Sequence, residues 1–335
     1  MEKRLTRRRA VSVNECVRYQ SLFLNTYMQN KINPISVLSP ATTANLGPGF
    51  DCLGMSLDLW NRLDVLPAEG GDEPLVEVIG EGESELATDS RNLVYQAMEF
   101  LFREADETIP PVHLICHNQV PLSRGLGSSA AAIAGGLVAG NALSRHTFSP
   151  NELLEMAATI EGHPDNVAAA ILGGLRLVIS DQNQLYTVPL GVPPEVHAVI
   201  LVPEVRIATE DARRVLPGTV SVTDAVYNMG RIALLVAGMT TNHPEYLSVA
   251  TQDQLHQPYR QTIFPAMKVI FKAARDAGAL GVFLSGSGST ILALTQGREM
   301  TVAYEMAEAA RQTELEYKVE VTKPTLLGAH LVNAN

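Results

Sequence analysis

The chain has 335 residues, 46% of them hydrophobic, which predicts about two domains and suffices for a large buried core. Its formal net charge of −11 argues against nucleic acid as the main partner, because binding to a phosphate backbone needs a basic surface. The three cysteines, Cys16, Cys52 and Cys116, are widely spaced without a C-x-x-C pattern, so they indicate neither a disulfide framework nor a zinc site and fit the reducing cytoplasm.

The first 33 residues differ in composition from the rest of the chain. Basic residues cluster at Lys3, Arg4, Arg7, Arg8 and Arg9. The weakly apolar segment behind them lacks the long apolar core of a cleavable signal. We therefore exclude residues 1–33 from the fold, as a disordered N-terminal extension or a stretch ahead of the true start at Met28, with a targeting tail as the alternative.

From residue 35 on, stretches rich in β-branched residues alternate with stretches of helical periodicity. We expect, in chain order, strands at 35–38, 63–65 and 75–79, a helix at 92–105 and a strand at 112–116. A glycine loop then leads to a helix at 130–142, a helix at 150–160 capped by Ser149, and a strand at 175–179. The last part carries a strand at 198–202, helices at 225–237 and 265–277, and a strand at 282–284.

This order favours two α+β layers over a single doubly wound sheet. We assign residues 34–190 to a first domain and residues 191–335 to a second. The longest apolar run, at 130–142, is rich in small residues and too short to cross a bilayer, so we expect no membrane contact.

The glycine loop is the most informative segment, Pro121-Leu-Ser-Arg-Gly-Leu-Gly-Ser-Ser-Ala-Ala131. Gly125 and Gly127 permit positive φ and let the backbone approach an anion closely. A loop that opens straight into a helix also presents unpaired N–H groups and the positive end of the helix dipole. The segment therefore predicts a phosphate site, although an ordinary N-cap turn is the alternative. It lacks the Gly-Lys-Ser/Thr ending of a Walker A loop, so a P-loop NTPase is disfavoured.

Four further groups of residues combine polar side chains with glycines or turns. They are residues 39–51, which supply Asn45 and Asp51 on a loop after a strand; residues 160–166, which begin a new helix; residues 285–290, a second loop of backbone donors with Gly286, Ser287 and Gly288; and Arg213 and Arg260, in turn-rich surroundings. Side chains of such varied chemistry exceed what a purely structural loop needs.

The segment Pro40-Ala-Thr-Thr-Ala-Asn-Leu-Gly-Pro-Gly-Phe-Asp-Cys-Leu-Gly54 is typical of homoserine kinases. With the two glycine loops, it makes the chain resemble the homoserine kinases of the GHMP small-molecule kinase superfamily, from about residue 34 to the C-terminus. Relatives similar to mevalonate kinase carry a lysine in the first motif, where this chain has none. The resemblance implies an α+β, two-domain GHMP kinase fold, with a ribosomal protein S5 domain 2-like N-terminal domain and a ferredoxin-like α/β sandwich C-terminal domain.

The resemblance also implies the reaction: ATP-dependent phosphorylation of the side-chain hydroxyl of L-homoserine to O-phospho-L-homoserine in threonine biosynthesis, with Mg²⁺ as cofactor and a homodimer as the assembly. The implied ATP-binding residues are Pro121, Leu122, Ser123, Arg124, Gly125, Leu126, Gly127, Ser128, Ser129, Ala130, Ala131 and Asn92. Asn92 could instead be a simple helix cap. Two other readings stay open: a sensor of this fold that binds ATP and a metabolite without turnover, and a kinase of another small alcohol.

Homoserine carries an ammonium, a carboxylate and a hydroxyl, and the resemblance assigns a partner to each. Asp51 matches the residue that pairs with the amine, with Asn45 beside it, while Arg213 and Arg260 match the carboxylate-binding arginines. The guanidinium fork suits bidentate capture of a carboxylate and argues against a sugar or an isoprenoid. His163 and Thr209 also fall on substrate-contacting positions. A solvated surface arginine and a turn-forming aspartate are the alternatives.

The metal and the proton acceptor are the remaining roles. Glu161 matches the family's Mg²⁺-binding glutamate, with Ser128 or Ser129 completing the coordination, and Glu155 is the alternative by spacing. The two glutamates point about 120° apart on a helix, so they cannot both face the metal. Asp165 is the obvious base on chemical grounds, yet the family implies that Asn166 contacts the acceptor hydroxyl without a dedicated base.

Overall fold

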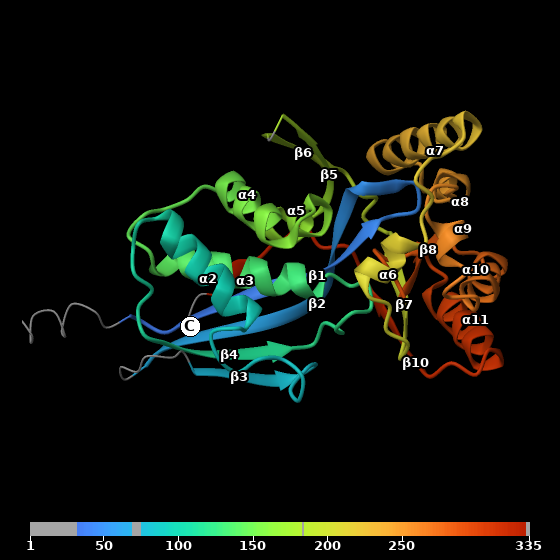
Figure 1. Ribbon diagram of the computed structural model, residues 1–335. Helices are drawn as coiled ribbons and strands as arrows, with labels where there is room; N and C mark the ends of the chain where they lie inside the picture. The colour runs from blue at the N-terminus through green and yellow to red at the C-terminus, as the bar shows by residue number, and fades with distance from the viewer. Residues whose placement is uncertain (1–31, 69–74, 183, 333–335) are drawn as a thin grey trace, which may run out of the picture.

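The computed structural model describes residues 32–68, 75–182 and 184–332 (Figure 1). The hypotheses about residues 1–31 lie outside these ranges. Within them the strands form two sheets, which lie side by side in Figure 1 and share a hydrophobic core. No helix in these ranges has the length and apolar character needed to span a membrane.

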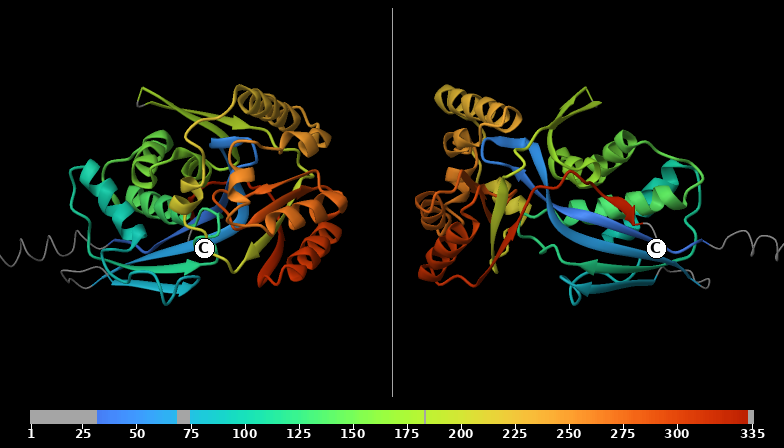
Figure 2. Two further views of the ribbon diagram at one scale, coloured as in Figure 1. Left: turned by 45° about the vertical axis from the view of Figure 1, so that its right-hand side comes forward. Right: turned by 180° about the vertical axis from the view of Figure 1, so that it is seen from behind.

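The first sheet is built on one long hairpin. Strands β1 (Ile35–Asn45) and β2 (Gly49–Pro67) pair antiparallel along almost their whole length. β11 (His330–Val332) returns from the end of the described chain to pair with β1, as the view from behind shows (Figure 2). β4 (Val112–Asn118) pairs antiparallel with β2, and β3 (Leu75–Gly80) runs parallel to β4. β5 (Leu175–Asp181) and β6 (Gln184–Leu190) form a second hairpin that joins β2 near its beginning.

Four helices cover one face of this sheet: α2 (Leu93–Glu104), α3 (Ser128–Leu143), α4 (Pro150–Glu161) and α5 (Pro164–Leu172) (Figure 1). Ser149 and Glu152 form the capping box that starts α4, which confirms the predicted cap. α3 lies buried and consists largely of alanine and glycine. At Gly136 a Cβ would lie 2.4 Å from the carbonyl oxygen of Val94, so only glycine allows α2 to pack this closely.

The second sheet is antiparallel, in the order β10–β7–β9–β8 within the described residues. Its strands are β7 (His197–Pro203), β8 (Gly281–Leu284), β9 (Ile291–Thr295) and β10 (Tyr317–Thr322). Its helices are α6 (Thr209–Arg214), α7 (Val222–Thr240), the 3₁₀ turn η1 (Pro244–Tyr246), α8 (Leu247–Ala250), α9 (Gln257–Arg260), α10 (Met267–Asp276) and α11 (Glu299–Gln312).

The two layers meet through β7, whose side chains alternate between two cores. Val199 and Leu201 pack under α10 and α11, whereas Ala198 and Ile200 join the core that contains Leu57 of the first sheet. A strand buried on both faces has a continuous apolar sequence, which explains why this one was predicted. The expected two-domain α+β architecture is confirmed. The boundary at residue 190 stays a prediction. Residues 330–332, assigned to the second domain, form β11 in the first sheet.

The structure corrects several local predictions. Residues 63–65 form a strand as predicted, but they are only the last part of the much longer β2. Asn45 and Asp51 lie in the hairpin strands, not on a loop. The hairpin turns within residues 46–48, where Leu46 and Gly47, together with the preceding Asn45, adopt positive φ. Arg213 lies in the last turn of the short helix α6 and Arg260 ends the short helix α9, whereas the sequence analysis placed both in turn-rich surroundings.

Candidate active site

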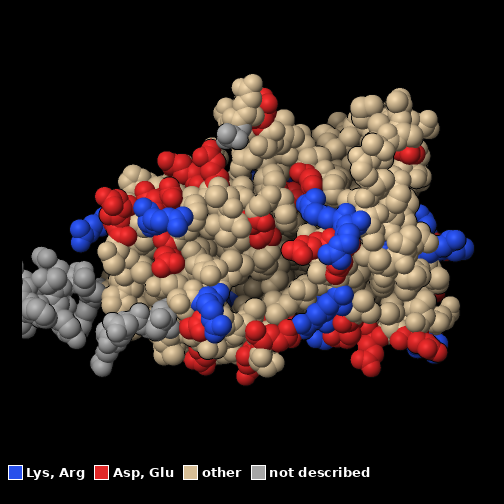
Figure 3. Space-filling view, viewed as in Figure 1, with Lys and Arg blue, Asp and Glu red and all other residues tan. Residues whose placement is uncertain are grey.

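A cavity of about 380 Å³ opens where the two layers meet. Figure 3 shows the hollow near the middle of the molecule, with basic and acidic side chains on its rim. The cavity collects most of the residues predicted for the site: Asn45, Asp51, Asn92, residues 121–129, Glu161, His163, Asp165, Asn166, Thr209, Arg213, Arg260, Gly286 and Ser287. Ala130, Ala131 and Gly288 do not line it. The two alanines are buried in the core because they lie on the inner face of α3.

The phosphate loop has the predicted geometry. Gly127 precedes α3 in the left-handed conformation, at φ 65°, and among the described residues no side chain caps this helix. The first N–H groups of α3 are therefore available to an anion in the cavity. A Cβ on Gly127 would lie 1.9 Å from the hydroxyl oxygen of Thr42, and one on Gly125 would lie 2.1 Å from the carbonyl oxygen of Ser285. Both positions require glycine for space as well as for φ.

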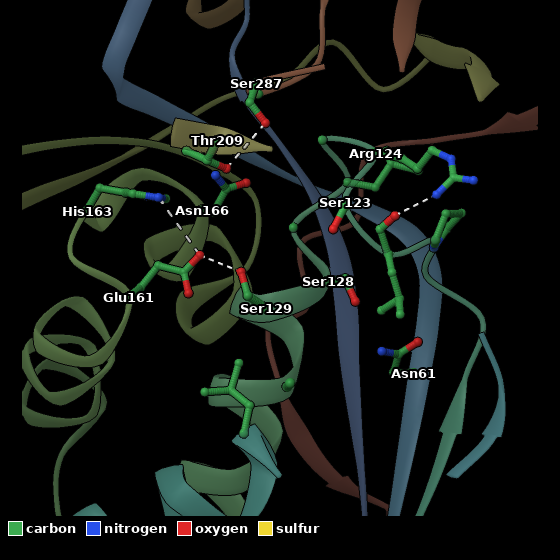
Figure 4. A pocket seen from close by; sticks show the side chains of 18 of the residues that line it. Asn61, Ser123, Arg124, Ser128, Ser129, Glu161, His163, Asn166, Thr209 and Ser287 are labelled. Carbon is green, nitrogen blue, oxygen red and sulfur yellow. Dashed lines mark hydrogen bonds and ion pairs between the residues drawn. The ribbon is translucent and has the colours of Figure 1, made fainter. Parts of the chain in front are cut away.

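The second glycine loop packs directly against the first. The hydroxyl of Ser285 donates to the carbonyl of Gly125 at 2.6 Å, and the N–H of Thr290 donates to the carbonyl of Arg124 at 3.0 Å. Ser287 faces the cavity, where its hydroxyl lies 3.5 Å from that of Thr209 (Figure 4). The loop thus supports the phosphate loop and carries one polar side chain into the site.

Arg124 points away from the predicted phosphate position. Its guanidinium donates to the carbonyl of Pro203 at 2.7 Å, to the carboxylate of Glu204 at 2.7 Å and to the carbonyl of Leu122 at 2.8 Å. The side chain is buried and ties the phosphate loop to the end of β7. The guanidinium of Arg124 is occupied by these contacts, so a contact of Arg124 with ATP would be made by its backbone.

Glu161 reaches into the cavity from the end of α4. Its carboxylate accepts a hydrogen bond of 2.5 Å from the hydroxyl of Ser129 and lies 4.0 Å from the imidazole of His163 (Figure 4). The serine in contact is Ser129, whereas Ser128 faces another part of the cavity (Figure 4). Glu155 is exposed and lies outside the cavity. The geometry therefore favours Glu161 over Glu155 as a metal ligand.

The donor set around Glu161 fits Mg²⁺ better than a transition metal. In the described ranges no three His, Cys, Asp or Glu side chains gather as a metal cage. Mg²⁺ commonly takes one or two carboxylates from the protein and completes its shell with phosphates and water. One carboxylate and one hydroxyl beside a phosphate loop match that requirement.

Asp165 and Asn166 lie in the first turn of α5 and line the cavity near Glu161. A carboxylate oxygen of Asp165 lies 2.9 Å from the imidazole of His163 and accepts from the N–H of Asn166 at 2.8 Å. This hydrogen bond raises the pKa of His163 against the opposing effect of burial. The amide oxygen of Asn166 accepts from the hydroxyl of Thr42 at 2.8 Å, which orients the amide in the cavity. The sequence analysis missed Thr42, although it lies in the quoted Pro40–Gly54 segment.

Asp51 and Arg213 form a bidentate ion pair on the cavity wall. The guanidinium donates two hydrogen bonds of 2.9 Å, one to each carboxylate oxygen. Both side chains are nearly 40% exposed, so water competes for the contact. The bidentate bond to Asp51 raises the pKa of Arg213. The two residues assigned to opposite ends of a zwitterion therefore lie together and carry opposite charges.

Arg260 is buried beside this pair. Its guanidinium donates to the carbonyl of Gly286 at 2.7 Å and to the imidazole of His256 at 3.2 Å. Burial lowers the pKa of Arg260 to about 10, which leaves it charged at neutral pH. The ring of Phe50 lies 5.4 Å from the guanidinium of Arg260 and 5.5 Å from that of Arg213, within range of cation–π attraction.

His256 completes the support of Arg260. Its Nε2 lies 2.7 Å from the carbonyl of Gly47, so this nitrogen carries the proton and Nδ1 accepts from Arg260. Full burial lowers the pKa of His256 to about 4, which keeps the ring neutral beside the cation. Neither His256 nor Phe50 was predicted, because their role depends on contacts between segments some 200 residues apart in sequence.

The side chains of Asn45 and Asn92 make hydrogen bonds to the protein itself. Asn45 donates to the carbonyl of Gly286 at 2.9 Å and accepts from the N–H of Asp51 at 3.0 Å, so it bridges the hairpin turn to the second glycine loop. Asn92 caps α2 by accepting from Val94 at 3.0 Å. Its position on the cavity wall, next to Leu93 and Val94, still leaves an apolar surface for a base.

Comparison with known proteins gives consistent results across the chain. The family model described as GHMP kinases N terminal domain matches residues 92–174, and that described as GHMP kinases C terminal matches residues 225–312. A homoserine kinase of Moorella thermoacetica is 42% identical over 293 residues, which cover 88% of this chain and 98% of that protein. One of Carboxydothermus hydrogenoformans is 41% identical, covering 88% and 96%.

Solved structures agree. The crystal structure of a homoserine kinase from Cytophaga hutchinsonii matches with a TM-score of 0.82 and 30% identity, covering 90% of this chain and 98% of that one. The mevalonate kinase of Methanococcus jannaschii matches with a TM-score of 0.67 at 12% identity, which supports the fold alone.

Proposed function

The chain belongs to the homoserine kinases of the GHMP kinase family, and on that premise we propose how its cavity transfers a phosphoryl group from ATP to L-homoserine. The reaction phosphorylates the side-chain hydroxyl and gives O-phospho-L-homoserine, a step toward threonine. One observation carries the assignment of roles: a carboxylate and two guanidiniums lie together on the cavity wall, beside a helix N-terminus that suits phosphate.

The phosphates of ATP bind at the start of α3. The backbone N–H groups after Gly127 supply donors, and the helix dipole favours the negative charge. The adenine occupies the apolar side of the cavity near Leu93 and Val94. Glu161 and Ser129 would hold Mg²⁺ beside the phosphate site. Charge neutralisation, the main electrostatic requirement of phosphoryl transfer, is the chemistry that the ion would supply there.

Homoserine binds by separating the Asp51–Arg213 pair. Its ammonium group binds the carboxylate of Asp51, and its carboxylate binds the guanidiniums of Arg213 and Arg260. Phe50 and His256 keep both arginines in place while their partner changes. Binding of the zwitterion would thus replace the Asp51–Arg213 ion pair by ion pairs between the substrate and each of these two residues.

The acceptor hydroxyl lies against Asn166. Thr42 fixes the amide oxygen, so the amide nitrogen is directed at the cavity as a donor. Asp165 is already engaged by His163 and by the N–H of Asn166, so we assign it to orientation of the loop and not to removal of the proton. A loose transition state permits the hydroxyl to lose its proton late, which makes a dedicated base unnecessary.

The resemblance to homoserine kinases also bears on the cellular location and the oligomeric state of the protein. We propose a cytoplasmic enzyme, in keeping with its free cysteines at Cys52 and Cys116, and a homodimer.

A coupled assay of ADP release tests the proposal, with L-homoserine beside L-serine, L-threonine, mevalonate and galactose as acceptors. We expect turnover with homoserine, and we expect Asn166→Ala to lower kcat about 100-fold or more, the usual effect of removing one aligned donor. Asp165→Asn serves as the comparison. ATP binding without turnover on any acceptor would favour a sensor and overturn the assignment.

A further inference from the structure

The guanidinium of Arg260 has one nitrogen that the protein does not use. A guanidinium carries five N–H donors, one on Nε and two on each of Nη1 and Nη2. In Arg260, Nε donates to the carbonyl of Ala212 at 3.3 Å. Nη1 donates one hydrogen to the carbonyl of Gly286 at 2.7 Å and the other to Nδ1 of His256 at 3.2 Å. Among the described residues Nη2 has no hydrogen-bond partner and is not a fully buried atom, so it opens on the cavity that Arg260 lines.

This use of donors limits how Arg260 can bind a carboxylate. A guanidinium captures a carboxylate with two nitrogens at once, through its Nε–Nη2 edge or its Nη1–Nη2 edge. Because Nε and Nη1 are already engaged, both edges are closed and Nη2 alone remains. Arg213 differs, since its Nη1 and Nη2 each lie 2.9 Å from a carboxylate oxygen of Asp51. Bidentate capture is therefore open to Arg213 and not to Arg260.

His256 is fixed in the orientation that keeps Nη1 engaged. Its Nε2 lies 2.7 Å from the carbonyl oxygen of Gly47, in the turn of the β1–β2 hairpin, which reaches across to the helices of the second layer (Figure 1). Its backbone N–H donates to the carboxylate of Asp253 at 3.0 Å, and that carboxylate accepts from the amide of Asn228 on α7 at 2.8 Å. His256, Asp253 and Asn228 are all buried. The imidazole is therefore held at both ends, and Nδ1 stays directed at the guanidinium.

The imidazole must also be neutral to accept a hydrogen bond at Nδ1. The charged groups that act on it are the carboxylate of Asp253, 3.5 Å from Nε2, the guanidinium of Arg260 and the carboxylate of Asp51. Full burial outweighs the two carboxylates and lowers the pKa of His256 to about 4. A neutral ring with its proton on Nε2 offers a lone pair at Nδ1, whereas a protonated ring would donate from both nitrogens and repel the guanidinium.

We propose that His256 is a positioning residue for the substrate: its Nδ1 holds Nη1 of Arg260, so that Nη2 is the single nitrogen that Arg260 presents to the carboxylate of homoserine. The inference rests on the proposed assignment of that carboxylate to Arg213 and Arg260. It adds a division of roles between the two arginines, a fork at Arg213 and one fixed donor at Arg260. Without the acceptor at Nδ1, one hydrogen of Nη1 is left unpaired in a buried site, and the guanidinium turns to satisfy it, which moves Nη2 off the carboxylate.

Two amide substitutions at His256 separate the roles of its two ring nitrogens. His256→Asn places Oδ1 where Nδ1 lies, so it keeps the acceptor for Arg260 and loses the donor to Gly47. His256→Gln places its amide nitrogen where the ring Nε2 lies, so it keeps the donor and loses the acceptor. We expect the KM for homoserine to rise at least about tenfold in His256→Gln and to stay within about threefold of the parent in His256→Asn. The KM for ATP should stay within about twofold in both variants.

Two further measurements separate positioning from a purely structural role. The preference for homoserine over homoserine amide, as a ratio of kcat/KM values, should fall in His256→Gln and not in His256→Asn, because the amide lacks the charge that Arg260 binds. The free energy of unfolding in urea should not follow this order, since His256→Asn is the variant that loses the contact with the hairpin. His243→Gln is the matched control, because His243 lies in the same layer, half exposed and outside the cavity.

The outcomes distinguish this inference from the proposed function. A parent enzyme without turnover on homoserine would overturn the proposed function, and this inference with it. Turnover by the parent with an equal rise in the homoserine KM of both variants, or with no rise in His256→Gln, would overturn the positioning role alone.

Nitrogen-15 NMR of the histidine-labelled parent gives an answer even if neither variant folds. We expect one imidazole that stays neutral, with its proton on Nε2, down to about pH 5. The absence of such a ring, or a neutral ring with its proton on Nδ1 in its place, would contradict the proposal.

Discussion

Replacing Asp51 by asparagine tests the exchange of ion pairs on which substrate binding is proposed to depend. In the free chain the Asp51–Arg213 pair is nearly 40% exposed on both sides, so it contributes at most about 1 kcal/mol. The bond from Asp51 to the ammonium of homoserine, enclosed in the cavity, is a hydrogen bond between charged groups and contributes about 1.5 to 3 kcal/mol. The Asp51→Asn variant loses the charged hydrogen bond to the ammonium of homoserine. It also no longer has to break the Asp51–Arg213 ion pair when homoserine binds, which offsets part of that loss.

The net loss is about 1.5 kcal/mol, which corresponds to a rise of roughly tenfold in the KM for homoserine. The KM for ATP should stay within about twofold, because the carboxylate of Asp51 binds Arg213 of α6 and, among the described residues, makes no hydrogen bond or ion pair with the start of α3. Steady-state kinetics with each substrate varied in turn measures both values.

Asp58→Asn is the matched control, since Asp58 lies on the same strand, is exposed and binds the indole of Trp60 outside the cavity. A rise in the homoserine KM below about threefold for Asp51→Asn, or an equal rise in the KM for ATP, would refute the assignment of Asp51 to the ammonium group.

Three further predictions concern the phosphate loop, the metal and pH. Gly127→Ala should weaken ATP binding at least about tenfold in a titration with a fluorescent analogue, since its Cβ would clash with Thr42. Gly297→Ala, outside the cavity, also has positive φ but open space and should leave ATP binding unchanged. Glu161→Gln should raise the Mg²⁺ concentration for half-maximal rate, and Glu155→Gln should not. The hydrogen bond with Asp165 raises the pKa of His163, so protonated His163 stabilises the folded state. This contribution is fully present below pH 6.5 and is lost as the pH rises through the folded-state pKa. His163→Gln should therefore flatten the fall in the free energy of unfolding over that pH range, as measured by urea titrations.

Local features of the site could be predicted because neighbouring residues determine them. The positive φ of Gly127 and the start of α3 follow from a glycine ahead of an alanine-rich run. The start of α4 follows from Ser149, Pro150 and Glu152, which satisfy the helix N-terminus within one turn. The phosphate loop was therefore predicted from its own residues.

The contacts that orient the side chains could not be predicted in this way. Thr42 and Asn166 are 124 positions apart, and nothing local to either residue indicates their hydrogen bond. Arg124 lies in the middle of the phosphate loop, yet carbonyls at the end of β7 provide a buried partner for its guanidinium. A buried guanidinium needs all its donors satisfied, and only the fold shows where the acceptors lie.

The same contacts join the phosphate site to the substrate site. Ser285 of the second glycine loop binds Gly125 of the phosphate loop, while Gly286, the next residue, accepts from both Asn45 and Arg260. A displacement of the second glycine loop must therefore move the support of Arg260 and the support of the phosphate loop together. Because both layers supply partners in these contacts, the reacting groups can meet only when the two layers are packed, which accounts for a cavity at their junction and not inside either sheet.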